Sequence, residues 1–189
     1  EQVSYFAIDV GQTLPVDMQA GKITLTGGSW NNVVFSHPFS EEPVVLASVQ
    51  TRNDGKIVVV FIQNLDANGF EIAIRNLGSA QPGTQEVGWI AITKGTYDFG
   101  SQVEFGKTGK DINHIKQIIS LSQSFTGIPV SVASITSVEG GQPCYLRGYV
   151  GAANDEIAMN IEETKAIDGW PGHAKEYVSW VAFYADLQG

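Results

Sequence analysis

The side chains best suited to chemistry are few. The chain has one thiol, Cys144, and three imidazoles, of which His173 could act as its base in a nucleophilic pair. Cys144, however, directly follows Pro143 in a strand-like segment, and a free cysteine in such a place ordinarily packs as a small apolar residue. Motifs of serine hydrolases, zinc peptidases, phosphate-binding loops and dinucleotide-binding folds do not occur. We therefore expect no catalytic activity; the alternative is a hydrolase that uses His173, Asp168 and Glu162.

A tryptophan in a loop-like segment favours binding instead. Trp170 lies in residues 167–173, where glycines and a proline disfavour a strand. An exposed indole offers an apolar surface to the C–H face of a sugar ring, while neighbouring polar groups bind its hydroxyls. We predict a carbohydrate-binding group of Trp170, His173, Asp168 and Arg147. In the alternative interpretation Trp170 folds back and closes the end of the domain.

Three polar turns contain oxygen ligands of the kind that Ca²⁺ prefers, at residues 53–55, 66–69 and 154–156. The same Asn, Asp and Gly residues are typical of tight turns, and their spacing does not follow a calcium-binding loop. The sequence therefore predicts no cofactor and no metal site, with Ca²⁺ binding as the alternative.

Composition limits the classes of function. The chain has 189 residues with 11 Lys+Arg against 20 Asp+Glu, a formal net charge of −9, and a hydrophobic fraction of 43%. An acidic chain argues against nucleic acid and anionic membranes as partners, because both require basic patches. A single cysteine excludes an intrachain disulfide. The chain does not begin with Met, so we expect a processed or excised segment.

The apolar residues alternate with polar ones along most of the chain, which is typical of β-strands. Gly-, Asn- and Pro-rich turns separate the short apolar runs, and no sustained helical periodicity occurs. The pattern predicts an antiparallel all-β fold. The clearest expected strands are residues 43–49, 56–62, 69–74 and 87–92, and we also expect a strand within 110–120.

An internal repeat organises the chain. A shift of 86 residues aligns five residues of the first half with identical residues of the second: Phe39, Pro43, Val44, Ala47 and Ser48 with Phe125, Pro129, Val130, Ala133 and Ser134. Further along, Glu71-Ile72-Ala73 aligns with Glu156-Ile157-Ala158, and Val87-Gly88-Trp89 with Val178-Ser179-Trp180. A period this long indicates a complete small domain rather than a solenoid unit. We predict two tandem antiparallel β-sandwiches of about six strands each, at residues 1–98 and 99–189, with Trp89 and Trp180 in equivalent core positions.

The repeated segments resemble the H-type lectin domain, a six-stranded antiparallel sandwich. The resemblance lies in an aromatic before Pro-Val-Val, an Asn-Gly-Phe step and a closing strand with Trp: Phe39 to Val45, Asn68-Gly69-Phe70 and Gly88-Trp89-Ile90 in the first repeat, Phe125 to Val130 and Ser179-Trp180-Val181 in the second. Glu162-Glu163, Asp168, His173 and Glu176 also resemble such modules in secreted bacterial polysaccharide-degrading enzymes. The resemblance implies a sandwich fold and carbohydrate binding.

One position departs from that family. An Arg at the start of the central strand binds the sugar in H-type lectins, and this position is occupied by Ile57 in the first repeat and Pro143 in the second. Neither side chain can donate hydrogen bonds, so the family's sugar site is not carried over. Arg147, further along the same strand, is the nearest substitute, and it aligns with Phe61 of the first repeat.

Together these observations predict a non-catalytic carbohydrate-binding module, secreted or extracellular, whose partner is a polysaccharide or glycan. We expect it to be attached to a larger multidomain polypeptide and to be a monomer rather than a trimer. The alternative function is a structural, adhesion or oligomerisation module of a larger secreted, surface or tail protein.

Overall fold

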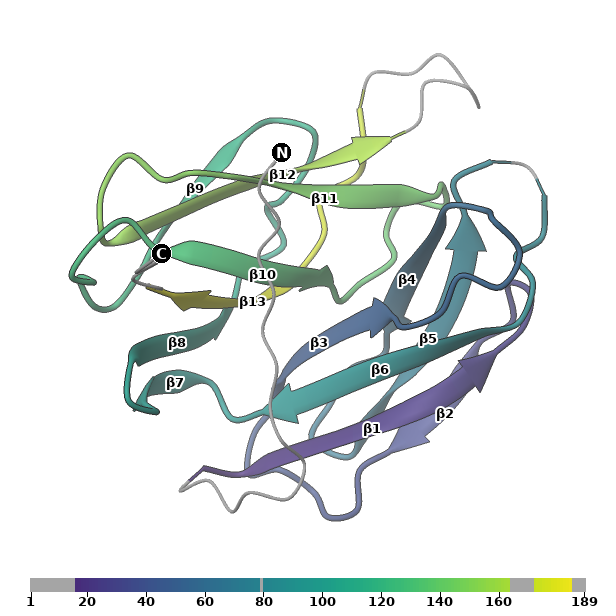
Figure 1. Ribbon diagram of the computed structural model, residues 1–189, viewed down its shortest axis with the longest axis horizontal. Helices are drawn as coiled ribbons and strands as arrows, with labels where there is room; N and C mark the ends of the chain where they lie inside the picture. The colour runs from purple at the N-terminus through teal and green to yellow at the C-terminus, as the bar shows by residue number, and fades with distance from the viewer. Residues whose placement is uncertain (1–15, 79, 164–171, 185–189) are drawn as a thin grey trace.

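The protein is all-β, as the sequence predicts. The computed structural model describes residues 16–78, 80–163 and 172–184, which form thirteen antiparallel strands in four sheets (Figure 1). These residues contain no helix, and hence none that could cross a membrane. The first six strands are β1 (Met18–Leu25), β2 (Asn31–Val34), β3 (Val44–Val49), β4 (Val58–Gln63), β5 (Gly69–Asn76) and β6 (Gln85–Ile92). The others are β7 (Gly95–Asp98), β8 (Gln102–Lys107), β9 (Gln117–Ser120), β10 (Val130–Ile135), β11 (Cys144–Tyr149), β12 (Glu156–Glu163) and β13 (Val178–Phe183).

The first six strands form one sandwich. One sheet has the order β1-β6-β3 and the other β2-β5-β4. Alternate residues of the central strands point inward, so Phe70, Ile72 and Ile74 of β5 meet Val87 and Ala91 of β6 in a buried cluster. This inward and outward alternation is the reason that the period-two pattern was informative.

The remaining strands repeat the same arrangement. Their sheets have the orders β8-β13-β10 and β9-β12-β11, which match β1-β6-β3 and β2-β5-β4 strand for strand. Strand β7 is additional and lies at the edge beside β8. Although β7 precedes the expected boundary at residue 98, it therefore pairs within the second half. Of the expected strand within residues 110–120, only β9 forms.

A cross-strand row around each of the two repeated tryptophans relates the two halves. The rows are Gly21–Trp89–Ala47 and Gly106–Trp180–Ala133. Trp180 is buried and Trp89 is partly buried. A Cβ atom on either glycine would overlap the indole of its own row, so each indole occupies space that a side chain at the glycine would fill. The residues that the sequence alignment pairs around Trp89 and Trp180 thus occupy matching positions in the two halves.

Backbone hydrogen bonds show that the predicted alignment of one block, at β5 and β12, is wrong by two residues. Phe39 N donates to Ala67 O in the first half, and Phe125 N donates to Asn154 O in the second. These bonds place β5 on β12 with a shift of 87 residues, so Glu71 corresponds to Ala158 and not to Glu156. Because side chains alternate with period two, a two-residue slip leaves every residue on the same face and is invisible to the hydrophobic pattern.

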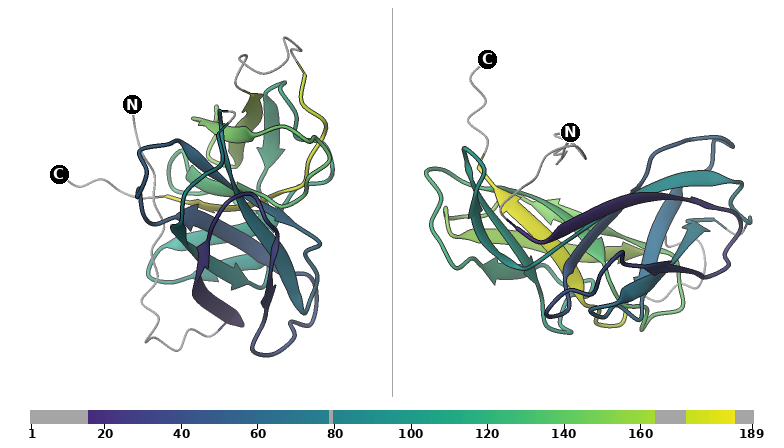
Figure 2. Two further views of the ribbon diagram at one scale, coloured as in Figure 1. Left: turned by 90° about the vertical axis from the view of Figure 1, so that its right-hand side faces the viewer. Right: turned by 90° about the horizontal axis from the view of Figure 1, so that it is seen from below.

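The two halves pack against each other through a third apolar cluster. The outer faces of β3 and β6 meet those of β8 and β13 there, with Val44 and Ile92 against Phe105 and Val181. The right-hand view in Figure 2 shows the two sandwiches side by side, with these strands where the halves meet. Strand β3 is at the edge of its sheet, and one of its backbone N–H groups is hydrogen-bonded by the second half: Ser134 Oγ accepts from Ala47 N at 3.0 Å.

Candidate functional site

The four predicted binding residues fall into three locations. Trp170 and Asp168 lie outside the described residues. Arg147 lies on the outer face of the β9-β12-β11 sheet, with a side chain 58% exposed. His173 lies on the inner side of the same sheet, with a side chain only 1% exposed. The structure therefore separates Arg147 from His173, and a ring buried in this way is not available to a ligand at the outer face.

His173 belongs to a buried polar cluster at one end of the second sandwich. Its Nδ1 lies 2.5 Å from Oε1 of Glu163 at the end of β12, and its Nε2 lies 3.1 Å from Oε1 of Glu176. The Sγ atom of Cys144 lies 3.5 Å from the same Nε2. The Glu176 carboxylate is also bound by the segment that follows β10. Glu139 N donates to it at 2.8 Å, and the Ser137 hydroxyl donates to it as well.

The cluster carries charge at neutral pH. Burial alone lowers the pKa of His173, but hydrogen bonds to Cys144, Glu176 and Glu163 outweigh burial and raise the pKa to about 10. Burial likewise raises the pKa of Glu176, but hydrogen bonds from His173, from the Ser137 hydroxyl and from backbone amides lower it overall. An imidazolium therefore lies between two carboxylates.

The order Cys144–His173–Glu163 has the form of a nucleophile, a base and an orienting acid. A nucleophilic pair must also be open to its substrate, however, and both Cys144 and the His173 side chain are buried. Cys144 aligns with Val58 of the first half, which is partly buried against the apolar core there. The geometry thus favours a structural ion-pair cluster over a catalytic triad.

In the first half, a neutral side chain takes the place of the Glu176 carboxylate. Gln85, which aligns with Glu176, is buried, and its Oε1 accepts from the Thr51 hydroxyl at 2.9 Å and from Asn53 N at 3.2 Å. These donors align with Ser137 and Glu139 of the second half. A buried amide or carboxylate thus fixes the loop after the third strand of each repeat. The carboxylate form requires a counter-charge, which His173 supplies.

The exposed candidate site is the outer face of the β9-β12-β11 sheet. Tyr145, Arg147 and Tyr149 alternate along β11 and project from this face. The register places Tyr145 opposite Glu162 and Arg147 opposite Asn160. We call these five residues the β11 face. In the sequence this face corresponds to the alternating residues Tyr145, Arg147 and Tyr149. The sequence analysis singled out Arg147 and missed the two tyrosines.

Hydrogen bonds hold the β11 face in place. Tyr145 Oη donates to Glu162 at 2.7 Å, and an Arg147 guanidinium nitrogen donates to the same carboxylate at 2.9 Å. These donors, Tyr145 first and Arg147 second, lower the pKa of Glu162, while the hydrogen bond to Glu162 raises the pKa of Tyr145. Tyr149 Oη donates to Asn160 Oδ1 at 3.2 Å. The aromatic and polar groups are therefore ordered before any ligand arrives.

The equivalent face of the first half is covered. Phe61 aligns with Arg147, but it is buried and packs within the apolar cluster of the second half. Arg75 lies over its ring, with Cζ 4.8 Å from the ring centroid, and donates to Gly141 O of the second half at 3.0 Å. The outer face of the β2-β5-β4 sheet is thus covered by the second half around Phe61, whereas the outer face of the β9-β12-β11 sheet is open to solvent around Arg147.

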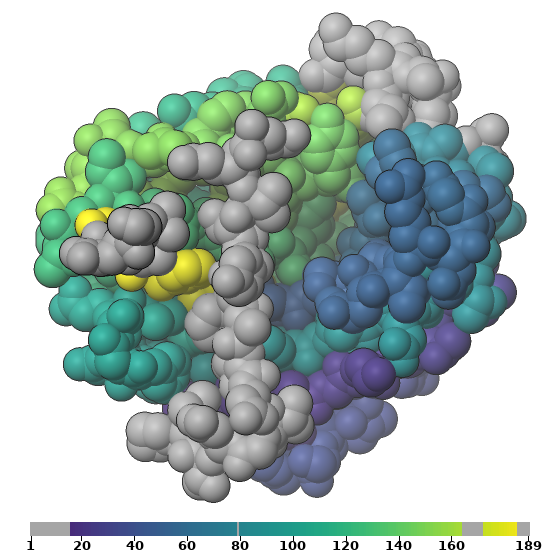
Figure 3. Space-filling model, in the orientation of Figure 1, coloured from purple at the N-terminus to yellow at the C-terminus, as the bar shows by residue number. Residues whose placement is uncertain are grey.

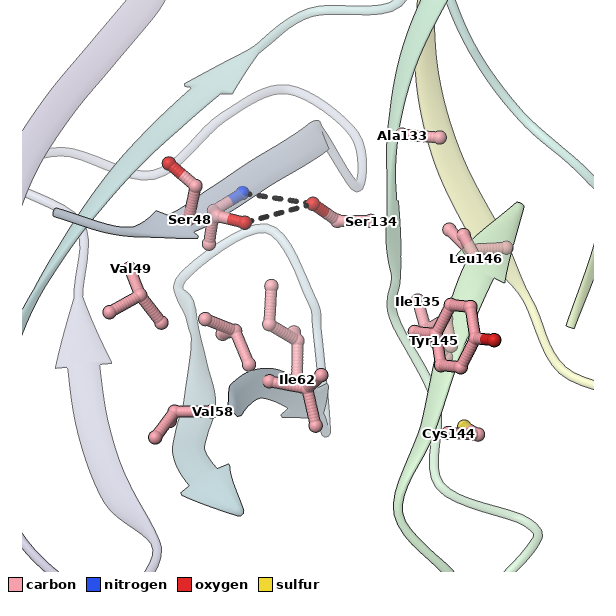
Figure 4. Close-up of a pocket in the computed structure, with 13 residues that line it drawn as sticks. Ser48, Val49, Val58, Ile62, Ala133, Ser134, Ile135, Cys144, Tyr145 and Leu146 are labelled. Atoms are coloured by element: carbon pink, nitrogen blue, oxygen red, sulfur yellow. Dashed lines mark hydrogen bonds between the residues drawn. The ribbon is translucent and has the colours of Figure 1, made fainter. Parts of the chain in front are cut away.

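A cleft separates the edges of the two sandwiches. It holds about 370 Å³ between β3 and β4 on one side and β10 and β11 on the other, and Figure 3 shows it as the hollow between the blue and green surfaces. Val49 and Val58 form part of one wall and Ile135 and Leu146 part of the other (Figure 4). The described lining contains no charged side chain, and Ser134 is engaged by β3. The cleft therefore offers few directional groups to a sugar.

The described residues contain no group of three or more His, Cys, Asp or Glu side chains placed to hold a metal ion. The Asp54 and Asp66 carboxylates accept hydrogen bonds from the backbone of their own turns or of neighbouring loops, and backbone donors lower the pKa of each.

Comparisons with protein-family models, curated proteins and solved structures gave no match. Among the described residues, the β11 face is therefore the strongest candidate for a binding surface.

Proposed function

We propose that the protein is a non-catalytic carbohydrate-binding module and that the β11 face binds a polysaccharide or glycan. The observation that carries the proposal is a hydrogen-bonded Tyr-Arg-Tyr row on an outer sheet face, with Tyr145 and Arg147 exposed and Tyr149 half-buried. Aromatic rings provide apolar surface for pyranose C–H groups, while guanidinium, phenol and carboxylate groups can exchange hydrogen bonds with hydroxyls.

The dimensions of the face suit an extended chain. Tyr145 and Tyr149 are four residues apart on β11, which corresponds to about 13 Å along a strand. Arg147 lies between them, so a ligand that spans both rings also passes the guanidinium. Because Glu162 and Asn160 already orient these side chains, little conformational entropy is lost on binding.

The resemblance to H-type lectins supports the same class of ligand, with a site in a different place. The family position of the sugar-binding Arg is Pro143 here, whereas Arg147 lies further along the same strand. Trp170 and Asp168 remain predicted contributors from the insertion of the second repeat. The proposal includes a secreted or extracellular location, attachment to a larger polypeptide and a monomeric state.

A glycan array tests the proposal. We expect the wild-type protein to bind at least one polysaccharide class, with Tyr149→Ala and Arg147→Ala each weakening binding about fivefold or more. Gln63→Ala is the matched control, because Gln63 ends β4 of the first half at the position that aligns with Tyr149. No binding to any glycan would favour the structural or adhesion role instead. Equal loss in all three variants would place the site elsewhere.

A further inference from the structure

We propose that the ligand of the β11 face is an acidic polysaccharide, whose anionic groups are bound by Lys116 and Arg147. This inference rests on the proposed carbohydrate-binding function and specifies its ligand. It follows from the placement of cations on a chain whose formal net charge is −9.

Two cations flank one tyrosine of the β11 face. Lys116 Nζ lies 5.2 Å from the centroid of the Tyr149 ring, and Arg147 Cζ lies 5.9 Å from the same centroid. Lys116 immediately precedes β9, on the side of β12 opposite to β11. The two positive groups therefore approach the same ring from the two strands that flank β12, and a ligand resting on Tyr149 meets both.

Lys116 differs from most of the described lysines in its lack of a carboxylate partner. Five described lysines form ion pairs with Asp or Glu: Lys22, Lys56, Lys94, Lys107 and Lys110. Within the described part of the chain Lys116 forms none, although acids outnumber bases almost two to one. An exposed cation held over an aromatic ring on an acidic protein is a position at which an anion can bind without competing with a protein carboxylate.

The described acids of the same sheet form no ion pair with Lys116. Glu162 is engaged by Arg147 and Tyr145, so one cation is compensated and Lys116 is not. Glu156 starts β12 at the far end from Glu162. The neutral Asn160 lies opposite Arg147 between these two carboxylates. An anionic group of a sugar bound near Tyr149 thus lies between Arg147, which Glu162 compensates, and Lys116, for which the described residues provide no ion pair.

The experiment compares polymers that share a backbone and differ in charge. Affinities for polygalacturonate and its methyl ester are measured by titration calorimetry at low and high NaCl, and dextran sulfate is compared with dextran in the same way. These arms separate carboxylate from sulfate as the bound anion. We expect at least fivefold tighter binding to an acidic polymer than to its neutral partner, and a loss of that preference at high salt.

Lys116→Gln should weaken binding to the acidic polymer about fivefold and leave binding to the neutral polymer unchanged. Lys22→Gln is the matched control, because Lys22 is an exposed lysine of β1 in the first half. Equal affinity for charged and neutral polymers would overturn the inference and leave the carbohydrate-binding proposal standing. Absence of binding to these polymers and to every glycan of the array would overturn both.

Discussion

Replacing His173 by glutamine tests the buried ion-pair cluster. The change leaves the carboxylates of Glu163 and Glu176 buried, with side chains 14% and 1% exposed, and without a cation between them. Leaving a buried charge without its partner costs about 3 to 5 kcal/mol of unfolding free energy. The pKa gives the same scale, because a rise from 6.5 to about 10 at roughly 1.4 kcal/mol per pKa unit corresponds to on the order of 4 to 5 kcal/mol.

The pH dependence has a definite sign. The folded-state pKa of His173 is raised, so its stabilisation is fully present below pH 6.5 and is lost as the pH rises towards 10. The pKa of Glu176 is lowered, so its contribution is present above about pH 4.5 and is lost below that value. Wild-type stability should therefore be greatest at about pH 5 to 6.5 and fall as the solution becomes alkaline.

Urea unfolding followed by circular dichroism at several pH values measures both effects. We expect His173→Gln to lose about 3 kcal/mol or more at pH 6 and to lose the alkaline dependence. Adding Glu176→Gln should recover much of the loss, since Gln85 fixes the equivalent loop of the first half without a histidine. His37→Gln is the control, because His37 is exposed. A loss below 1 kcal/mol at pH 6 with an unchanged pH profile would refute this reasoning.

Three further predictions concern packing and binding. Phe61→Ala should cost about 3 kcal/mol or more of unfolding free energy, and Arg147→Ala less than about 1 kcal/mol, because aligned positions are buried in one half and exposed in the other; urea unfolding compares them. Gly106→Ala should lower the melting temperature by several degrees, because its Cβ overlaps the Trp180 ring, and calorimetry showing no change would contradict this. Trp170→Ala should weaken glycan binding about fivefold with an unaltered melting temperature; lower stability with unaltered binding would assign Trp170 to the core.

The strands were predictable because one side of each sheet faces a core. Alternation fixed the expected strands at residues 43–49 and 69–74, and the repeat placed Trp89 on Trp180, each beside a glycine of a neighbouring strand. The alignment of Glu71 failed by two residues, because a slip of two preserves the apolar pattern. Backbone pairing, which the pattern does not contain, decides that register.

The site was only partly predictable. Arg147 was recognised as a polar residue on a strand, but its exposure depends on which outer face the other half covers, and Phe61 shows that the equivalent face can be buried. His173 was predicted to bind a ligand; in the structure its ring lies between Glu163 and Glu176, which are ten residues before it and three after it. Contacts of this kind arise from tertiary packing, and local spacing does not encode them.

The most direct test of glycan binding at the β11 face is an amide chemical-shift titration by NMR with an oligosaccharide of the class selected on the array. Binding at this face predicts that the largest shifts occur at Tyr145, Arg147 and Tyr149 and at the neighbouring residues of β12. The aligned segment of β4, around Phe61, should be unaffected because the second half covers it. Shifts confined to β3 and β4, or shifts absent from β11 at saturating ligand, would contradict the assignment of the β11 face.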